Sequence, residues 1–294
     1  MVRLVTYNIQ YSRGKDDRYD LERVVSSVAD ADLIALQEVE RGWPRTEFID
    51  QPARLGELLP DHYWVFAPTF DMHGGGQAHE NRRRQFGPML LCRRPIIWSR
   101  AHVLPKLASV DHFNMDTGAL ECAIETSVGV VRFFSLHLSA LDSRERVLQT
   151  EFLLDLNAQA VACGAAWTGP PVSGGSADWS ADAPRPETSR HAVLLGDFNS
   201  EPTDPVYDLL LGPRDHYAGR VPRVDSFVDV WARAHNDEQA EPTWYLPPGY
   251  PDSRDKRLDY GFVSAELASR VTDTWVDREA LGSDHQPVWI EMEL

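Results

Sequence analysis

Several polar side chains of the types that bind hard cations follow apolar stretches of the sequence. Asn8 comes directly after LVTY, Glu38 after LIALQ, and Asp197 and Asn199 after VLLG. Polar residues at the ends of apolar strands commonly project into one crevice of a sheet, where they build a site. Carboxylate and amide oxygens are the ligands that Mg²⁺ and Mn²⁺ prefer. The pattern therefore predicts a divalent-cation site at the ends of several strands.

Asn8 and Glu38 are expected to end the first two strands, Leu4–Ile9 and Leu33–Val39, on either side of a helix over Tyr19–Ala29. A strand–helix–strand unit places parallel strands side by side, so their ends are neighbours. An amide beside a carboxylate, without a thiolate pair or a His-rich cluster, suits Mg²⁺ or Mn²⁺ better than Zn²⁺. An acidic residue after a strand also occurs as a solvated helix start, so Glu38 is interpreted together with its neighbours.

The segment Gly196-Asp197-Phe198-Asn199 follows another buried apolar run. Gly, Asp and Asn all favour turns, so an ordinary turn is one interpretation. The spacing also points the side chains of Asp197 and Asn199 the same way, while Phe198 anchors the loop inward. We therefore predict that this turn presents both polar groups to the site.

Histidine and acidic residues form the third group. Asp284 and His285 lie in SDHQPV, and Asp259 lies in an apolar segment that could form an adjacent strand. A buried carboxylate needs a partner, and a histidine held by a carboxylate can serve as a general base or as a phosphate clamp. His137, between Leu136 and Leu138, is either a further site histidine or a core residue.

The sequence resembles the endonuclease/exonuclease/phosphatase superfamily, which has the DNase I-like fold. Seven motifs in matching order carry the resemblance over the length of the chain. They are TYNI, LQEV, FGPMLLCRRPI, SLHL, GDFN, RLDY and SDHQPV.

The resemblance implies a four-layer α/β sandwich, with two mixed β-sheets packed face to face and helices on the outer faces. It also implies Mg²⁺-dependent cleavage of a phosphate ester. By motif position, Asn8, Glu38 and Asp284 would surround the metal. Asp197 and Asn199 would orient the attacking water and the phosphate.

The same resemblance implies that His285, held by Asp259, is a base or stabilises developing charge. His137 matches a histidine that contacts the phosphate or protonates the leaving group. Many family members have Asn where this chain has Pro88, and proline lacks the N–H and fixes φ. We expect this difference to alter substrate contacts nearby without touching the proposed metal ligands.

Substrate-binding residues are expected in the loops. Arg82 and Arg84 end a Gly-rich segment at positions 71–85, and guanidinium groups match phosphate oxygens. Trp244 could line the cleft, although aromatic residues more often pack than stack on a base. The 71–85 segment is interpreted as a surface loop rather than as a second metal site.

The remaining pattern predicts the framework that positions these groups. A helix is expected over Arg144–Ala162, and positions 164–190, rich in Gly, Pro, Ser and Ala, are expected to form a flexible insertion within a single domain spanning 1–294. A turn is expected at Ser127–Gly129. The further strands are expected at Pro88–Cys92, Leu120–Glu125, Val130–Leu136, His191–Gly196, Arg257–Val263 and Pro287–Glu293.

Composition excludes several classes of protein. The 294 residues are 43% hydrophobic, which is ample for a core, yet no apolar run approaches the roughly 20 residues that span a bilayer. No secretory signal is visible, and the 3 cysteines form no CxxC pair, so a reducing, cytoplasmic setting is predicted. The formal net charge of −16 disfavours a general nucleic-acid binder without excluding one. Nothing indicates a protein partner.

Three functions are consistent with these observations. The favoured one is a Mg²⁺- or Mn²⁺-dependent phosphodiesterase acting on a small-molecule or lipid-headgroup ester, with phosphomonoester hydrolysis as a variant. The second is a DNA or RNA nuclease of the same superfamily. The third is a non-catalytic binding module that retains the fold, which the intact set of polar residues argues against.

Overall fold

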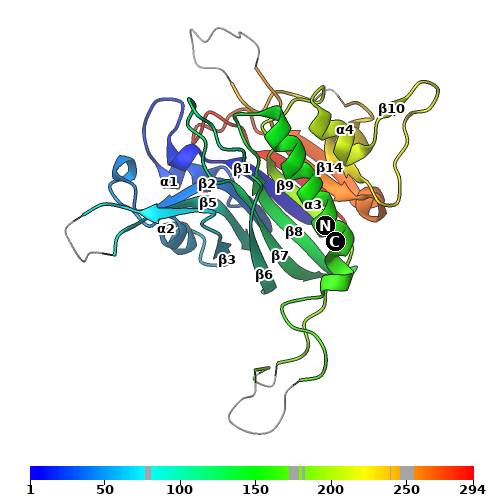
Figure 1. Cartoon of the computed structure of the whole chain (residues 1–294), viewed down its shortest axis with the longest axis horizontal. Helices are drawn as coiled ribbons and strands as arrows, with labels where there is room; N and C mark the ends of the chain where they lie inside the picture. The colour runs from blue at the N-terminus through cyan, green and yellow to red at the C-terminus, as the bar shows by residue number, and fades with distance from the viewer. Residues whose placement is uncertain (77–80, 172–178, 181–182, 239, 246–254) are drawn as a thin grey trace.

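The computed structural model describes residues 1–76, 81–171, 179–180, 183–238, 240–245 and 255–294, and most of its strands belong to two sheets (Figure 1). In the first sheet, β4 (Phe70–His73) pairs with β5 (Arg83–Cys92) but lies outside the consecutive order of the other strands. The main order is β14 (Val271–Val276), β15 (Val288–Met292), β1 (Val2–Asn8), β2 (Leu33–Arg41), β5 (Arg83–Cys92) and β3 (Tyr63–Phe66).

The second sheet carries the other half of the framework. Its order is β12 (Phe227–Asp229), β13 (Asp259–Ser264), β9 (Ala192–Asp197), β8 (Gly129–His137), β7 (Gly118–Thr126) and β6 (Ile96–Val103). A separate short pair is formed by β10 (Arg214–Asp215) and β11 (Gly219–Arg220). The helices are α1 (Leu21–Ser26), α2 (Gln51–Leu58), α3 (Ser143–Cys163), α4 (Pro205–Leu211), α5 (Val230–His235) and the 3₁₀ segments η1 (Gln10–Ser12), η2 (Pro44–Thr46) and η3 (Ala265–Arg270).

Alternation along the strands creates four layers. In β1, Leu4 faces the core between the two sheets, whereas Val5 faces α1 and α2. In β8, Phe133 joins the same central core, whereas Phe134 faces α3 and α4. Figure 1 shows α3 lying across the second sheet and the two termini side by side, and Val2 pairs with Met292. The predicted four-layer α/β sandwich is confirmed.

Strand direction brings the polar strand ends together. β1 and β2 are parallel, as predicted, and β8 and β9 are parallel in the opposite sheet. The carboxyl ends of both pairs therefore meet at one edge of the sandwich. β13 runs antiparallel to β9, so its first residue, Asp259, pairs with the last residue of β9, Asp197. The start of β13 therefore lies at the same edge as the carboxyl end of β9.

The two helix predictions made from periodicity differ in accuracy. The helix predicted over Tyr19–Ala29 is shorter, because Asp20 caps it by accepting from the Arg23 N–H at 3.1 Å. The Ser27 hydroxyl donates to the Arg23 carbonyl at 3.2 Å and so competes with continuation of the helix. The long helix predicted over Arg144–Ala162 agrees closely with α3.

Two segments predicted as loops differ in structure. The ends of the 71–85 segment form an antiparallel hairpin in which His73 pairs with Arg83, and residues 77–80 lie outside the described residues. In the insertion at 164–190, the described residues contain no helix or strand, and 172–178 and 181–182 lie outside them. The end of the insertion packs on the second sheet, since Trp98 Nε1 donates to the Glu187 carbonyl at 2.8 Å.

Among the helices in the described part of the chain, none combines the length and hydropathy needed to span a bilayer.

Candidate active site

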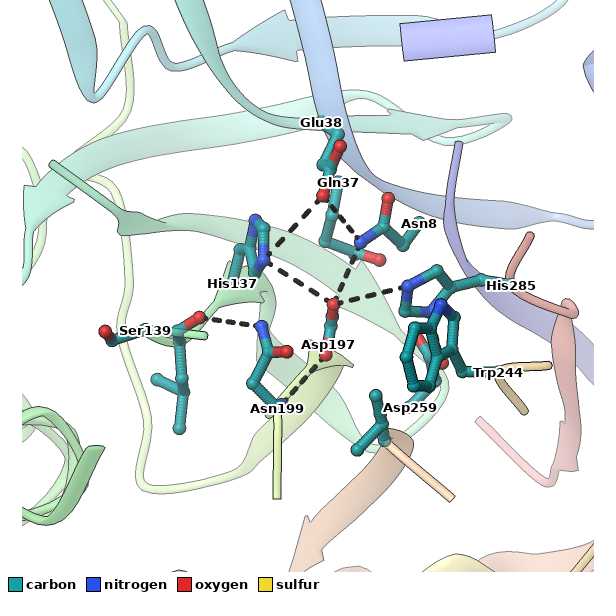
Figure 2. A network of polar contacts seen from close by, with 12 residues as sticks. Asn8, Gln37, Glu38, His137, Ser139, Asp197, Asn199, Trp244, Asp259 and His285 are labelled. Carbon is teal, nitrogen blue, oxygen red and sulfur yellow. Dashed lines mark hydrogen bonds and ion pairs between the residues drawn. The ribbon is translucent and has the colours of Figure 1, made fainter. Parts of the chain in front are cut away.

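The polar strand ends form one connected cluster at the edge of the sandwich. Figure 2 shows Asn8, Glu38, His137, Asp197 and His285 pointing toward one another from both sheets. All of these except the buried Asn8 line a cleft of about 710 Å³, whose lining also includes Asn199. The convergence predicted from the strand ends therefore occurs, and it joins residues at the ends of the first two strands with His285, which precedes the last strand.

Glu38 reaches this cluster because β2 is irregular at that position. Its pairing with β5 shifts register between Leu36 and Val39, and Glu38 has a φ of 61°. A bulge of this kind re-aims a side chain that a regular strand would send elsewhere. The amide of Asn8, at the end of β1, then donates to Glu38 Oε1 at 3.1 Å.

Asp197 is the centre of the cluster. Its Oδ2 accepts from Asn8 Nδ2 at 2.9 Å and lies 3.5 Å from His137 Nε2 and 3.8 Å from His285 Nε2. Its Oδ1 accepts from the backbone N–H of Asn199 at 2.8 Å. The side chain is almost fully buried, so these contacts fix the orientation of its carboxylate. Four groups from four motifs therefore meet at this one side chain.

The turn after β9 is held as the sequence predicts. Phe198 is buried against the rings of Tyr260 and Phe262, with centroids 5.6 and 4.9 Å away. Asn199 has a φ of 47°, a conformation that Asn tolerates better than most residues. Its side-chain amide donates to the Leu138 carbonyl at 3.0 Å, which fixes the amide at the wall of the cleft.

Asp259 and His285 form a buried pair. His285 Nδ1 lies 2.8 Å from Asp259 Oδ2, which also accepts from the Thr243 hydroxyl at 2.7 Å. Burial lowers the pKa of His285, but the carboxylates of Asp259 and Asp197 outweigh it and raise that pKa to about 10. Burial raises the pKa of Asp259 to about 6. Near neutral pH the pair is therefore an imidazolium held by a carboxylate.

His137 ends β8 at the cleft rather than within the hydrophobic core. Its side chain is 13% exposed, and Nε2 lies 3.5 Å from Asp197 and 4.0 Å from Glu38. Since both neighbours are carboxylates, the imidazole is placed where it can carry a proton to or from a group in the cleft.

Asp284 lies at the same cleft but enters the cluster through a different residue. Gln10 Nε2 and Trp244 Nε1 both donate to Asp284 Oδ2, at 2.9 and 3.0 Å. The backbone N–H of Gln10 donates to Asn8 Oδ1 at 3.0 Å. Gln10 thereby connects Asn8, at the end of the first strand, with Asp284 in the SDHQPV motif. Nothing in the sequence around Gln10 indicates that role.

The other expected substrate-binding residues are more dispersed. Trp244 lines the cleft. The Arg84 guanidinium lies 6.0 Å from the centroid of Trp43, a cleft residue, but Arg84 itself does not line the described part of the cleft. Arg82 is exposed before β5 and is also absent from that lining.

Several cleft residues were not predicted from the sequence. Nothing local in the sequence marks Gln10, Tyr11, Arg45, Arg146 or Lys256. Thr243, which is buried beside the cleft residues and donates to Asp259, is detectable only as the neighbour of Trp244.

The donor set at Asn8 and Glu38 fits a hard divalent cation. Burial raises the pKa of Glu38, although the charge of His137 acts to lower it. Among the described residues, the Asn8 amide is the one hydrogen-bond donor to the Glu38 carboxylate. A cation beside this carboxylate would favour its ionised form. Asp284 adds a carboxylate at the same cleft. Oxygen donors of these types are the ones that Mg²⁺ and Mn²⁺ take.

A second group of possible ligands has a different interpretation. Asp197, Asp259 and His285 each offer one ligand atom, and these atoms lie within 4.8 Å of one another. His285 Nδ1 and Asp259 Oδ2 already contact each other at 2.8 Å, and Asp259 Oδ2 also accepts from the Thr243 hydroxyl. We therefore assign this group to hydrogen bonding.

Comparisons with known proteins agree with this geometry. The model of the endonuclease/exonuclease/phosphatase family matches residues 5–285. No curated protein gives a significant match.

Solved structures show the same fold. An endonuclease/exonuclease/phosphatase from Beutenbergia cavernae is 22% identical, with a TM-score of 0.66 over 100% of this chain and 71% of that one. A mannosyl-6-phosphatase from Bacteroides thetaiotaomicron is 18% identical, with a TM-score of 0.59 over 100% of both chains. A 3′ phosphatase from Neisseria, bound to a product DNA hairpin, is 20% identical, with a TM-score of 0.58 over 100% of both chains.

Proposed function

The chain belongs to the endonuclease/exonuclease/phosphatase family, whose members hydrolyse phosphate esters, and we propose that it is a Mg²⁺- or Mn²⁺-dependent phosphodiesterase. The proposed substrates are small-molecule or lipid-headgroup esters, because the net charge of −16 opposes long-range attraction of a polynucleotide. The observation that carries the proposal is the convergence of Glu38, Asp197 and His285 at one cleft, with Asn8 hydrogen-bonded to Glu38 and Asp197 behind it.

Asn8, Glu38 and Asp284 are the residues that would hold the cation. A divalent ion bound there would neutralise negative charge on the phosphoryl and leaving oxygens. Gln10 keeps these groups together, because it donates to both Asn8 and Asp284. Trp244 Nε1 donates to the same Asp284 oxygen as Gln10 does.

Asp197 is proposed to accept a proton from the attacking water. Its carboxylate is fixed by donors on both oxygens, so it presents a constant direction to the cleft. Asn199 is proposed to orient the phosphate through its side chain. A positioned carboxylate and amide act together in this way, because one takes the proton while the other stabilises charge on oxygen.

The two histidines are proposed to act as donors to the phosphate group. The Asp259 carboxylate keeps His285 protonated and fixes its ring, so Nε2 carries a proton toward the cleft. His137 is proposed to donate to a phosphoryl oxygen or to protonate the leaving group. Trp244, Arg84 and Arg82 remain proposed substrate contacts, with Arg82 and Arg84 reaching only substrates that extend beyond the cleft.

We also propose a cytoplasmic location. The three cysteines, Cys92, Cys122 and Cys163, are all free thiols, as expected of a reducing compartment.

A substrate panel tests the proposal. The purified protein, with Mg²⁺ or Mn²⁺, is assayed against bis-p-nitrophenyl phosphate, p-nitrophenyl phosphate, sphingomyelin, lysophospholipids and plasmid DNA. We expect hydrolysis that stops when the metal is chelated, and the highest kcat/KM for a small diester or a lipid headgroup. Fastest cleavage of DNA, with affinity falling steeply as salt rises, would favour the nuclease alternative. Inactivity toward every ester with both metals would favour a non-catalytic module.

A further inference from the structure

An arginine outside the polar cluster forms part of the cleft wall. Arg45 lies in η2, and its guanidinium is 3.6 Å from the ring centroid of Tyr11 and 4.5 Å from that of Trp43. All three residues line the cleft that also contains Glu38. Contacts of a guanidinium with two aromatic rings stabilise its position as well as its charge.

The Arg45 side chain is also fixed by hydrogen bonds to a buried carboxylate. Its Nε and Nη2 donate to Glu40 Oε2 at 2.9 and 2.5 Å. Glu40 is fully buried, and its other oxygen accepts from the Thr46 hydroxyl at 2.6 Å. Gln51 holds the Tyr11 carbonyl at 2.8 Å, where Tyr11 has a φ of 46°. The guanidinium is therefore ordered before any ligand arrives, which lowers the entropy cost of binding.

One edge of this guanidinium remains available to a ligand. Arg45 Nη1 makes no hydrogen bond with any residue that the structure describes, and the side chain is 34% exposed. Arg146, another cation of the cleft, already donates to the Ser139 carbonyl and to Asp204. The Nη1 hydrogens form stronger hydrogen bonds with an anionic phosphate oxygen than with a neutral acceptor, so a phosphate group suits this edge of the guanidinium.

From these contacts we propose that Arg45 forms a subsite for a second phosphate group of the substrate, separate from the phosphate that is hydrolysed. The inference rests on the proposed phosphoesterase function and narrows its substrates to bisphosphorylated compounds. In the alternative, Arg45 only clamps Tyr11 and Glu40 as part of the fold.

Binding measurements separate these alternatives without requiring turnover. By calorimetry at constant ionic strength with Mg²⁺, the Kd of thymidine 5′-phosphate is compared with that of thymidine 3′,5′-bisphosphate. Glucose 6-phosphate and glucose 1,6-bisphosphate form a second pair with a different spacing. We expect the bisphosphate of at least one pair to bind on the order of tenfold more tightly, as one charge-assisted hydrogen bond provides.

The test variant is Glu40→Gln with Arg45→Gln, which leaves the net charge unchanged and no buried charge unpaired. We expect the bisphosphate preference to fall to within about twofold of unity. The matched control is Arg41→Gln with Asp50→Asn, a pair 2.8 Å apart that does not line the described part of the cleft. This control, folded as judged by circular dichroism, is expected to keep the preference.

Equal Kd values within both pairs for the wild type would overturn the subsite, as would a preference that survives in the Arg45 variant. Neither result would affect the proposed phosphoesterase function, which depends on hydrolysis in the substrate panel. Conversely, a bisphosphate preference in a protein that hydrolyses no ester would retain the subsite and reject the enzyme.

Discussion

Pro88 of β5 lies opposite the bulge of β2 that contains Glu38. Leu36 pairs with Met89 and Val39 with Gly87, so Gln37 and Glu38 together face Pro88 alone. A proline inside a sheet is compatible with a bulge, since it has no N–H to donate to a regular ladder. The expectation that Pro88 does not touch the proposed metal ligands stays a prediction, because the register relates Pro88 to Glu38 only through the backbone. Its partner across the sheet is the segment that carries Glu38.

Replacing Pro88 tests this coupling. In Pro88→Ala the restored N–H can support a more regular ladder, which would move the Glu38 carboxylate. We expect the Kd of Mn²⁺, measured by calorimetry, to rise on the order of tenfold, as for other changes in residues that support ligands. Pro60→Ala, at an exposed proline, is the control. An unchanged Kd with only a lower free energy of unfolding would mean that Pro88 merely stiffens the chain.

Removing the charge of Glu38 tests the cation site itself. Glu38→Gln keeps the shape of the side chain and the contact with Asn8 but removes a charged ligand. We expect a loss of kcat/KM on the order of 10²-fold or more at limiting Mg²⁺, together with weaker Mn²⁺ binding. Glu125→Gln, on an exposed carboxylate of β7, should behave as wild type. Full activity of Glu38→Gln in the presence of a chelator would refute metal dependence.

Asp197 and His285 should be needed for turnover. We expect Asp197→Ala and His285→Ala each to lower kcat on the order of 10²-fold or more, because one loses the proton acceptor and the other a cationic donor. His112→Ala, at an exposed histidine, serves as the control. The role assigned to either residue is wrong if its variant stays within about twofold of wild type.

Thr243 should act as a positioning residue for the buried pair. Its hydroxyl donates to Asp259 Oδ2 at 2.7 Å and accepts from the backbone N–H groups of Leu258 and Asp259 at 3.0 Å. Thr243→Val leaves these buried groups unsatisfied, so we expect unfolding to become easier by about 1–3 kcal/mol and kcat to fall on the order of tenfold.

Thr243→Ser keeps the hydroxyl and should recover most of kcat. Steady-state kinetics and urea unfolding of both variants separate the two contributions. Equal losses of kcat in the Val and Ser variants would show that the methyl group, rather than the hydrogen bonds, determines the effect.

A buried ion pair far from the cleft should control stability in acid. Burial alone would raise the pKa of Glu121, but hydrogen bonds from His102 and Arg132 outweigh it and lower that pKa. A carboxyl group with a lowered folded-state pKa contributes stability above its unfolded pKa, and this is lost as the pH falls through the folded value. The contribution of Glu121 should therefore be complete near neutral pH and decline below about pH 4.

Glu121→Gln leaves the fully buried Arg132 without a charged partner. We expect the free energy of unfolding near neutral pH to fall by about 3–5 kcal/mol, and the difference from wild type to shrink in acid. Urea titrations across the pH range measure this difference. A difference that stays constant with pH would contradict the assignment.

Local sequence patterns determined much of the framework and most of the cluster. Apolar runs predicted the strands that became β1, β2, β7, β8, β9, β13 and β15, and polar residues at their ends predicted Asn8, Glu38, Asp197 and Asn199. These predictions succeed because strand alternation and turn preference depend on neighbouring residues. The strands β3 (YWVF) and β14 (VTDTWV) were not predicted, although their residues favour strands, and pairing with β5 and β15 places them at the two edges of the first sheet.

Only the tertiary structure decided how those groups meet. Asn8 and Asp197 are 189 positions apart, and their contact depends on two sheets packing with both parallel pairs ending at one edge. The bulge opposite Pro88 and the stacking of Arg45 on Tyr11 arise in the same way. Such contacts join residues that are distant along the chain. Their geometry depends on how whole layers pack, and a local sequence pattern does not determine that packing.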